Sequence, residues 1–401
     1  MANLYDKSSL VLIPSGTKTG KVFSQKPVSG DGDFTFTRAS AATRVNADGN
    51  IEKETQNLFT YSNDFNNAAW TIASGNIVTG GQAGYDGSSD AWEIQAPSSN
   101  WILRRVNTQT GVQTISVYVK KNATYGLRLY AFGTDNANVY YNLNTGVVVA
   151  RDTDVIDDSI TDVGNDWWRI TMTYNQTNTQ FYFYVTDNSN STISGGTIVI
   201  QDAQLEQGLV ARDYIETTTA AVYGGITDNT PRLDYTDSSC PALLLEPQRT
   251  NLIPNSEYIP ATFFPINSNL TANSGISPEG VQNSTAVNVI SLSNGYCYYV
   301  PAVTDGVTYK FSAYYKGTAG ESISMRTINS FTGDITSNTF TLTGNWQREE
   351  VNLTAGPSNN LVYLYDGRVG GLTATDFEIY GAQLEAGSYA TSYIPTYGSS
   401  V

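Results

Sequence analysis

Aromatic residues near planar polar residues are the side chains of this sequence best suited to ligand chemistry. A sugar stacks its C–H face on an exposed ring, while its hydroxyl groups bond to Asp, Asn, Gln or Arg. The candidate stacking rings are Trp70, Trp92, Trp101, Tyr130, Tyr140, Tyr141, Tyr296, Tyr298, Tyr363 and Tyr365. Packing in a core or an interface is the competing interpretation, and we favour it for any one ring considered alone.

A run of carboxylates could hold a cation. Asp152, Asp154, Asp157 and Asp158 offer the hard oxygen ligands that Ca²⁺ prefers. The run lacks the glycine spacing and the terminal glutamate of an EF-hand loop. A solvated acidic loop is therefore the favoured interpretation, and Ca²⁺ is the one cofactor that the sequence leaves open.

Histidine is absent from the sequence, which constrains catalysis. Triads with histidine, histidine bases and histidine metal ligands are excluded within this chain. Glycoside hydrolysis needs only two facing carboxyl groups, and the 37 acidic residues leave that chemistry open without any motif that selects a pair. Glu206 and Glu385 recur at matching places, and we predict that they bond to backbone N–H groups instead of acting in catalysis.

The composition indicates an acidic, strand-rich protein. A net charge of −15 argues against a nucleic-acid partner, because phosphate binding needs clustered Lys and Arg. The start lacks the basic-then-apolar profile of a signal peptide, and no apolar run approaches the roughly 20 residues that cross a bilayer. We therefore expect a soluble protein made in a cytoplasm. Cys240 and Cys297 are predicted to be free thiols, because they lie far apart without CxxC spacing.

One segment occurs twice and organises the chain. The segment 204–217 returns as 383–396 with eight identities at the same spacing, Gln-Leu-Glu-x-Gly-x-x-Ala-x-x-Tyr-Ile-x-Thr. Upstream, Asn57-Leu58 and Ser62 match Asn251-Leu252 and Ser256 at an offset of 194 residues (251 − 57). Repetition at this scale predicts two tandem copies of one module.

The offsets between the copies locate a length difference. The strand ending at Lys120 matches one ending at Lys316 at an offset of 196, whereas Trp167 matches Trp346 at an offset of 179. The first copy therefore has 17 more residues (196 − 179) in this interval, which we expect to form a surface loop or an added hairpin. Trp167 and Trp346 occupy matching places and are predicted to be core residues.

Each module contains seven or so short segments of alternating polarity, which predict an all-β fold of two tandem antiparallel β-sandwiches of the jelly-roll type. We assign residues 57–219 to the first module and 251–401 to the second. Residues 1–56 form a strand-rich attachment segment, in which Leu10 to Gly16 is predicted as a buried strand and Asp33 to Arg38 as a half-buried one. Asp48-Gly49 marks a hairpin turn. Residues 220–250 form a structured connector that packs with the N-terminal segment.

The N-terminal segment and the connector resemble stretches of tailed-bacteriophage virion structural proteins. The resemblance rests on Leu10 to Gly16, Asp33 to Ser40, Ala42 to Glu52, Pro231 to Tyr235 and Pro241 to Leu252. In many such proteins the Thr-Arg-Val-Asn stretch runs almost directly into Pro-Arg-Leu-Asp-Tyr, whereas about 180 residues separate them here, as an insertion or duplication would. The modules are similar to the jelly-roll carbohydrate-binding modules on phage head or tail appendages.

The resemblance implies a non-enzymatic protein of the virion surface, a capsid decoration, head fibre or tail fibre, whose modules adhere weakly to host or environmental glycans. Its partners would be other virion proteins and copies of itself, in a trimer or at a symmetric capsid position, after assembly in the host cytoplasm. The alternatives are a polysaccharide depolymerase that uses a carboxylate pair, and a decoration protein that binds only its own virion.

Overall fold

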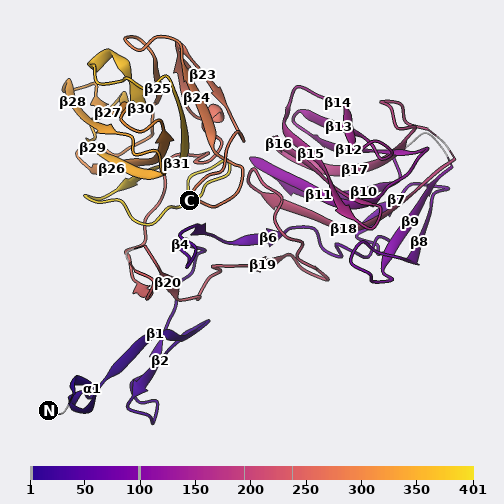
Figure 1. The fold of residues 1–401 in the computed structure, drawn as a ribbon, viewed down its shortest axis with the longest axis horizontal. Helices are drawn as coiled ribbons and strands as arrows, with labels where there is room; N and C mark the ends of the chain where they lie inside the picture. The colour runs from indigo at the N-terminus through magenta and orange to yellow at the C-terminus, as the bar shows by residue number, and fades with distance from the viewer. Residues whose placement is uncertain (1–2, 98–100, 194, 237) are drawn as a thin grey trace. The chain divides into compact units, whose positions relative to one another are not determined.

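The computed structural model describes residues 3–97, 101–193, 195–236 and 238–401, and these residues are almost entirely β-structure. The chain forms two compact units. One comprises Gln56–Val222 and Tyr397–Ser399 and contains the first module. The other comprises Met1–Thr55, Tyr223–Thr396 and Ser400–Val401, and it contains the N-terminal segment, most of the connector and the second module (Figure 1). The domain limits drawn from the sequence stay a prediction.

The first module is an antiparallel β-sandwich of two six-stranded sheets. The sheet that we call the front sheet has the order β14-β13-β12-β17-β10-β7, and the back sheet has the order β15-β16-β11-β18-β9-β8. The front strands are β7 (Trp70–Ile72), β10 (Leu103–Gln109), β12 (Gly126–Gly133), β13 (Asn136–Asn142), β14 (Val147–Arg151) and β17 (Asn178–Thr186). The back strands are β8 (Ile77–Gln82), β9 (Ala91–Ala96), β11 (Val112–Lys120), β15 (Val155–Gly164), β16 (Trp167–Asn175) and β18 (Gly196–Gln207).

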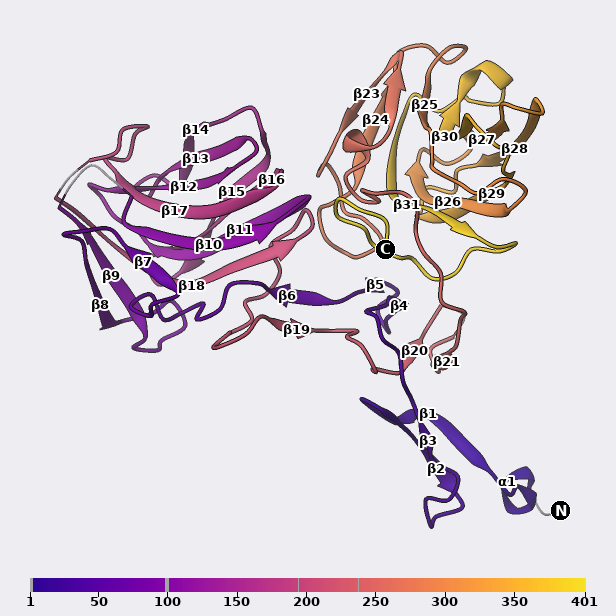
Figure 2. The same ribbon diagram turned by 180° about the vertical axis from the view of Figure 1, so that it is seen from behind.

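The second module is a sandwich of two five-stranded antiparallel sheets (Figure 2). Its front sheet has the order β22-β25-β30-β27-β28, and its back sheet has the order β23-β24-β31-β26-β29. The front strands are β22 (Phe264–Ile266), β25 (Tyr296–Tyr299), β27 (Ser322–Asn329), β28 (Asp334–Thr341) and β30 (Asn360–Asp366). The back strands are β23 (Ser268–Thr271), β24 (Thr285–Val289), β26 (Thr308–Gly317), β29 (Gln347–Thr354) and β31 (Asp376–Ala386). The predicted fold class is confirmed.

The strand orders explain the longer first copy. Aligning the two modules leaves β14 and β15 without counterparts, and each of these strands lies at the edge of a different sheet. The additional residues are therefore neither a surface loop nor a hairpin within one sheet. They extend both layers of the first sandwich by one strand.

The repeated segment closes each sandwich through the same hydrogen bonds. Asn57 Nδ2 donates to the carbonyls of Ala203 and Ile215, and Asn251 Nδ2 donates to those of Ala382 and Ile394. The hydroxyls of Ser62 and Tyr214 lie 2.6 Å apart, as do those of Ser256 and Tyr393.

The two repeated glutamates also belong to this closure. Glu206 Oε2 accepts from the Arg212 N–H at 3.0 Å, and Glu385 Oε1 accepts from the Thr391 N–H at 2.8 Å. The predicted structural role of both glutamates is confirmed, because a buried carboxylate satisfies a backbone donor.

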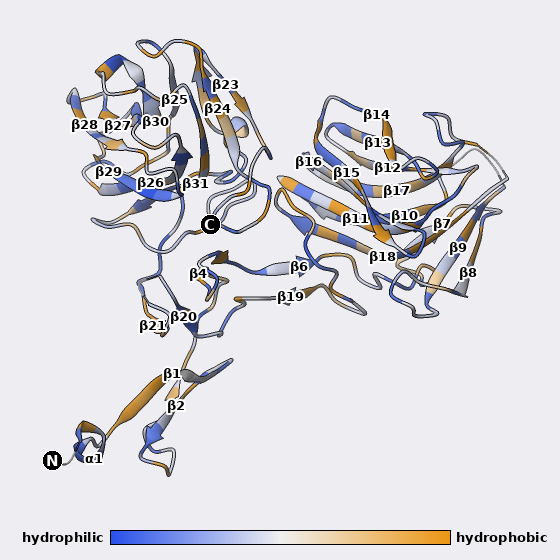
Figure 3. Cartoon of the chain, viewed as in Figure 1, coloured by the Kyte–Doolittle hydropathy of each residue, from blue (hydrophilic) through white to orange (hydrophobic). Residues whose placement is uncertain are grey.

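The N-terminal segment departs from its predicted burial. β1 (Val11–Lys18), β2 (Lys21–Lys26) and β3 (Phe34–Thr35) form a three-stranded sheet. Figure 3 shows β1 largely in the colour of hydrophobic residues, yet Leu10, Leu12 and Ile13 are exposed, so the prediction of a buried strand was wrong. The prediction of a half-buried strand from Asp33 to Arg38 was also wrong in part, because only Phe34–Thr35 form a strand and both residues are exposed. Among the apolar residues of this small sheet whose burial the structure describes, only Val22 is buried, since so short a segment carries too few apolar residues for a core.

The rest of the N-terminal segment contacts the connector. β4 (Arg44–Val45) and β5 (Ile51–Glu52) form the hairpin predicted around Asp48-Gly49. In the connector, β20 (Arg232–Asp234) pairs with β21 (Ala242–Leu244), and the Val45 N–H donates to Asp234 Oδ1 at 2.9 Å. The Arg38 guanidinium donates to the carbonyls of Thr227 and Thr230. The remaining short strands, β6 (Thr55–Asn57) and β19 (Val222–Gly224), pair with each other.

A buried ion-pair cluster attaches the N-terminal segment to the second module. Lys53 Nζ lies 2.6 Å from Glu257 Oε1 and 2.7 Å from Glu279 Oε1. Asn283 donates to both glutamates. All three charged side chains are buried, so the attachment is internal to this unit.

The structure also bears on the cysteines, the two matching tryptophans and the search for membrane-spanning segments. Both cysteines are free, with Cys240 exposed and Cys297 buried in the core of the second module, as predicted. Trp167 is buried as predicted, whereas Trp346 is only half-buried and donates its Nε1–H to the Ile276 carbonyl. No helix among the described residues is long and apolar enough to cross a membrane.

Candidate functional site

The outer face of the front sheet in the first module carries a row of aromatic rings. Alternation along β12 and β17 places Leu127, Leu129 and Phe183 in the core and turns Tyr130 and Tyr182 outward. Trp101, Tyr182, Tyr130 and Phe132 follow one another with centroid separations of 5.7, 5.5 and 6.3 Å. We call these four residues the aromatic row. Phe132 is 42% exposed, and the other three rings are half-buried.

Polar groups lie beside the aromatic row. Arg128 stands opposite Tyr184 across β12 and β17, and its guanidinium carbon lies 4.5 Å from the Tyr184 ring centroid and 4.8 Å from that of Tyr130. Arg128 Nε donates to Asn138 Oδ1 at 2.7 Å, which fixes the guanidinium over the rings. At the other end of the row, the Arg104 guanidinium lies over the Trp101 ring. The face therefore combines stacking surfaces with planar donors.

Tyr130 and Tyr184 of this face keep their protons at neutral pH. Burial is the main cause that raises the pKa of Tyr130 and of Tyr184 above the usual tyrosine value. The Tyr130 hydroxyl donates to Asn136 Oδ1 at 2.9 Å, and that of Tyr182 donates to Gln180 Oε1. Neutral hydroxyls that both donate and accept match the hydroxyl groups of a sugar.

The structure places the predicted stacking rings either on the outer face of a front sheet or against a core. Trp101, Tyr130 and Tyr140 reach the outer face of the front sheet, and Tyr296 and Tyr298 do so in the second module. Tyr363 lies on the same face as Tyr296 and Tyr298, but it is buried at 4% exposure, so the prediction of an exposed ring was wrong for it. The prediction of an exposed stacking ring was wrong for Trp70, Tyr141 and Tyr365. They are buried in the two cores at 2%, 0% and 0% exposure, so a sugar cannot reach them. Trp92 packs against the first core from the back sheet, with its Nε1–H bonded to the Asn63 carbonyl.

Sequence reasoning missed Tyr182 and Tyr184, which complete this face. The signal was present, because Phe181-Tyr182-Phe183-Tyr184 alternates a purely apolar ring with one that has a hydroxyl. In a strand with one buried face, the phenylalanines take the core side and the tyrosines the outer side.

The front sheet of the second module carries a matching aromatic face, whose Tyr296 and Tyr363 rings are covered by arginine side chains. Arg326 stands opposite Tyr363 as Arg128 stands opposite Tyr184. Tyr296, Tyr298 and Tyr363 form a triangle with centroid separations of 5.9 to 6.0 Å. The Arg368 guanidinium carbon lies only 3.6 Å from the Tyr296 ring centroid, and Tyr363 is 4% exposed.

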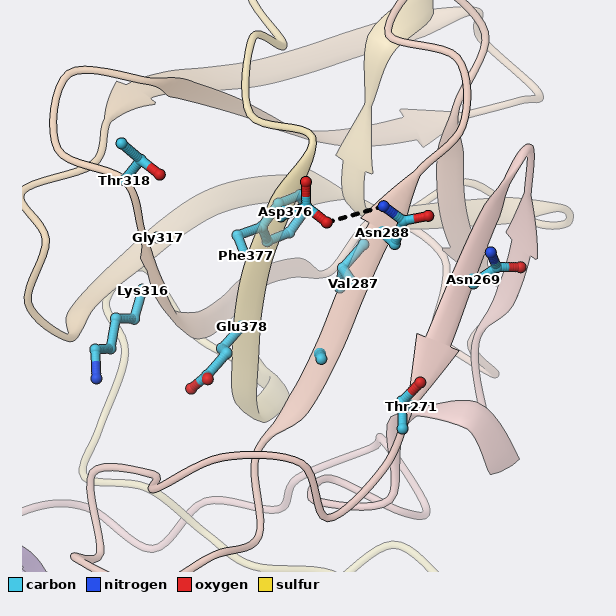
Figure 4. A pocket seen from close by; sticks show the side chains of 11 residues that line it. Asn269, Thr271, Val287, Asn288, Lys316, Gly317, Thr318, Asp376, Phe377 and Glu378 are labelled. Atoms are coloured by element: carbon cyan, nitrogen blue, oxygen red, sulfur yellow. Dashed lines mark hydrogen bonds between the residues drawn. The ribbon is translucent and has the colours of Figure 1, made fainter.

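A polar pocket of about 530 Å³ lies on the outer face of the back sheet in the second module (Figure 4). Figure 4 shows Asn288 and Asp376 bonded across neighbouring strands, with Lys316 and Glu378 on the same side of the pocket. Asp376 and Glu378 are two carboxylates on one strand face, which is the arrangement that hydrolysis would need. Hydrogen bonds from Asn288 and Thr375 hold the pKa of Asp376 below its usual value, the opposite of a general acid.

Two carboxyl groups of the first module have raised pKa values. Burial raises the pKa of Asp202 to about 7 and that of Glu206 to about 7. Both side chains are buried, at 5% and 2% exposure, so neither faces a substrate. Their protonation bears on stability and not on a reaction at the surface.

The predicted cation ligands are dispersed. Asp157 and Asp158 lie in β15, where Asp158 pairs with Arg151 at 2.7 Å. Asp152 accepts from Asn138, and Asp154 lies exposed between the two strands. Within the described part of the chain, no group of three or more acidic or cysteine side chains could hold a metal ion.

Comparison with known proteins gives similarity to solved structures alone. No protein-family model and no curated protein matches the sequence. The tandem CBM22-1-CBM22-2 domain of Paenibacillus barcinonensis Xyn10C is 14% identical, over 88% of this chain and 100% of that one, with a TM-score of 0.27. The CBM22-1-GH10 modules of Clostridium thermocellum xylanase 10B, complexed with xylohexaose, are 18% identical over 36% of this chain and 29% of that one, with a TM-score of 0.27. The M60 catalytic domain with CBM51-1 and CBM51-2 of Clostridium perfringens ZmpB is 10% identical over 86% of this chain and 43% of that one, with a TM-score of 0.22.

Proposed function

We propose that this chain is a non-enzymatic structural protein of a bacteriophage virion surface that adheres weakly to glycans through the front sheet of its first module. The aromatic row is the observation that carries the glycan-binding part of the proposal. Neighbouring rings, three of them held on regular strands, offer stacking surfaces at low cost in conformational entropy. The neighbouring Arg104, Arg128 and Asn138 supply the planar polar groups that orient sugar hydroxyls.

The virion part rests on the resemblance of the N-terminal segment and the connector to phage structural proteins. These two stretches are far apart in the sequence, yet they are hydrogen-bonded to each other through Arg38, Val45 and Asp234. The small sheet β1-β2-β3, with its exposed apolar residues, is the part that we assign to attachment on the particle. Copies arranged by particle symmetry, as a trimer or on a capsid site, would convert weak single contacts into firm adhesion.

A glycan array tests the adhesive part. We expect binding by the chain displayed in many copies, with strong loss in the Tyr182→Ala variant and none in Phe331→Ala, which removes a ring 70% exposed on another surface of the protein. No binding by the multivalent chain would reduce the modules to a structural role. The particle part is tested by antibody labelling and cryo-electron microscopy of intact virions, where absence of the chain from the particle surface would contradict it.

A further inference from the structure

The two modules carry the same front-sheet framework, and one of the residues at which they differ lies next to the rings of the second module. β17 and β30 end in matching turns, in which Asp187 Oδ1 accepts from the Ser189 N–H at 3.1 Å and Asp366 Oδ1 accepts from the Arg368 N–H at 3.0 Å. Asp366 follows Asp187 by 179 residues, and Arg368 follows Ser189 by the same number. The same offset relates Tyr184 to Tyr363. Arginine in the second module therefore stands where the first module has serine.

The Arg368 guanidinium lies over the tyrosine rings of this face. Its guanidinium carbon lies 3.6 Å from the centroid of the Tyr296 ring and 5.1 Å from that of Tyr363. A planar group at this distance covers the ring face on which the C–H face of a sugar would stack.

A second set of contacts holds Arg368 in this position. Its Nε donates to Asp366 Oδ1 at 2.8 Å and its Nη2 donates to Asp366 Oδ2 at 2.9 Å, a two-point pairing that fixes the plane of the guanidinium. Arg326 also pairs with Asp366 at 2.7 Å, so the carboxylate is anchored from the sheet itself.

We propose that the front sheet of the second module is a glycan-binding face closed by its own Arg368, and that the open face of the first module provides the glycan affinity of the chain. This inference rests on the proposed function. The ligand class is the same for both faces, a saccharide that stacks on tyrosine, and Arg368 decides which module can take it.

The residue swap Arg368→Ser tests the proposal, because it installs the residue of the first module. Asp366 keeps its Arg326 partner in this variant, so no buried carboxylate is left alone. The matched control is Arg151→Ser, which also removes an exposed arginine paired with a carboxylate. Melting curves of both variants check that the fold is retained.

The first measurement needs no ligand. Hydroxyl-radical footprinting with mass spectrometry should show faster oxidation of Tyr296 in Arg368→Ser than in the unmodified chain, and no change in Arg151→Ser. Unchanged oxidation of Tyr296 would overturn the proposal, whatever the chain binds.

The second measurement uses a glycan array and a chain in which Tyr182→Ala has removed the aromatic row. Adding Arg368→Ser to this background should increase binding by about twofold to fivefold, because a cation–π contact at an exposed site is worth about 0.5–1 kcal/mol and no longer competes with the sugar for the ring. Faster oxidation of Tyr296 without any gain in binding would also overturn the proposal, since the face would then be uncovered but not a glycan site. Failure of the proposed function would be seen separately, as absence of binding by the unmodified multivalent chain.

Discussion

At the residue scale, strand parity decides which rings of this Tyr-rich protein meet solvent. Tyr140 and Tyr141 are neighbours on β13, yet Tyr140 reaches the outer face while Tyr141 lies in the core with its hydroxyl bonded to the Thr171 carbonyl. A ring in a strand is thus assigned to a face by its register with neighbouring strands. Composition cannot make this assignment, because both residues are tyrosines.

Removing one ring of the aromatic row should weaken glycan adhesion without unfolding the module. For Tyr182→Ala we expect about a tenfold loss of affinity, on the order of 1.4 kcal/mol, because the central ring contacts both Trp101 and Tyr130 and breaks the row when removed. Affinity electrophoresis in gels containing a polysaccharide identified on the array measures the change. Equal mobility of Tyr182→Ala and Phe331→Ala would contradict the assignment of the site.

Asp202 should make the first module less stable as the pH rises toward neutrality. Burial raises its folded-state pKa to about 7 from 3.8, against a smaller opposing effect of the hydrogen bond from Tyr85. The native state therefore holds a proton where the unfolded state has lost it, so the stabilisation is complete below about pH 4 and is lost between about pH 4 and pH 7. Asp202→Asn should gain about 1–3 kcal/mol at pH 8 and flatten the dependence of unfolding free energy on pH.

The substitution is also compatible with the backbone. Asp202 has a φ of 56°, a left-handed conformation that asparagine tolerates and that Gly381 adopts at the matching place in the second module. The neighbouring acids Asp86 and Asp90 also disfavour a charge on Asp202. Urea unfolding from pH 4 to pH 8 measures the effect, and a pH dependence as steep in Asp202→Asn as in the unmodified chain would show that another group is responsible. Glu206 shifts in the same direction, so some dependence should remain.

At the scale of elements, the repeated segment is a structural closure whose key residue is a buried asparagine. Asn57 Oδ1 accepts from the N–H groups of Phe59 and Leu205, at 3.1 and 3.2 Å, while its Nδ2 donates to two carbonyls. One fully buried side chain thus satisfies four backbone groups that link β18 to the start of the module.

Asn57→Ala should destabilise the first module by about 2–4 kcal/mol, because it leaves buried donors and acceptors without partners. The corresponding fall in Tm is about 5–10 °C for a domain of this size. Differential scanning calorimetry measures it, with Asn144→Ala at an exposed turn of the same module as the control. A Tm change in Asn57→Ala no larger than that of the control would show that water replaces the side chain at no cost.

The added strands β14 and β15 illustrate how tertiary structure uses a length difference. The interval in the sequence is too short to indicate whether it forms a loop, a hairpin or separate strands. Pairing of β14 with β13 and of β15 with β16 sends its two halves to different sheets. Of the acidic residues that suggested a cation site, Asp157 and Asp158 lie on β15, while Asp152 and Asp154 lie in the turn between β14 and β15.

At the scale of the whole molecule, the buried cluster of Lys53, Glu257 and Glu279 attaches the N-terminal segment to the second module. Lys53→Met should cost about 3–5 kcal/mol, because two buried carboxylates lose their cation. Urea unfolding should show this loss against Lys7→Met, which removes an exposed lysine of the same segment. Equal stability of the two variants would mean that the glutamates find another partner or a shared proton.

Adhesion should depend strongly on the number of copies. A single chain with one open face is expected to bind only weakly, whereas linked copies gain about 10²–10⁴ in avidity from the high effective concentration of the second site. Surface plasmon resonance of the free chain and of chains displayed on a particle measures the ratio. Identical apparent affinities would indicate that particle geometry prevents simultaneous contacts.

The sequence by itself determined the all-β class, the two tandem modules and the structural role of Glu206 and Glu385, because alternating polarity and repeated spacing report local structure directly. It also named aromatic rings as the candidate stacking surface for a sugar, with packing as the favoured interpretation for any one ring. Only the tertiary structure decided which rings lie on that face. Strand register sends Trp70, Tyr141 and Tyr365 into cores, and it gathers Tyr130 and Phe132 from β12, Tyr182 from β17 and Trp101 from the segment before β10. The difference between an open and a closed face likewise depends on Arg368 reaching back over Tyr296, a contact across the fold that sequence spacing does not encode.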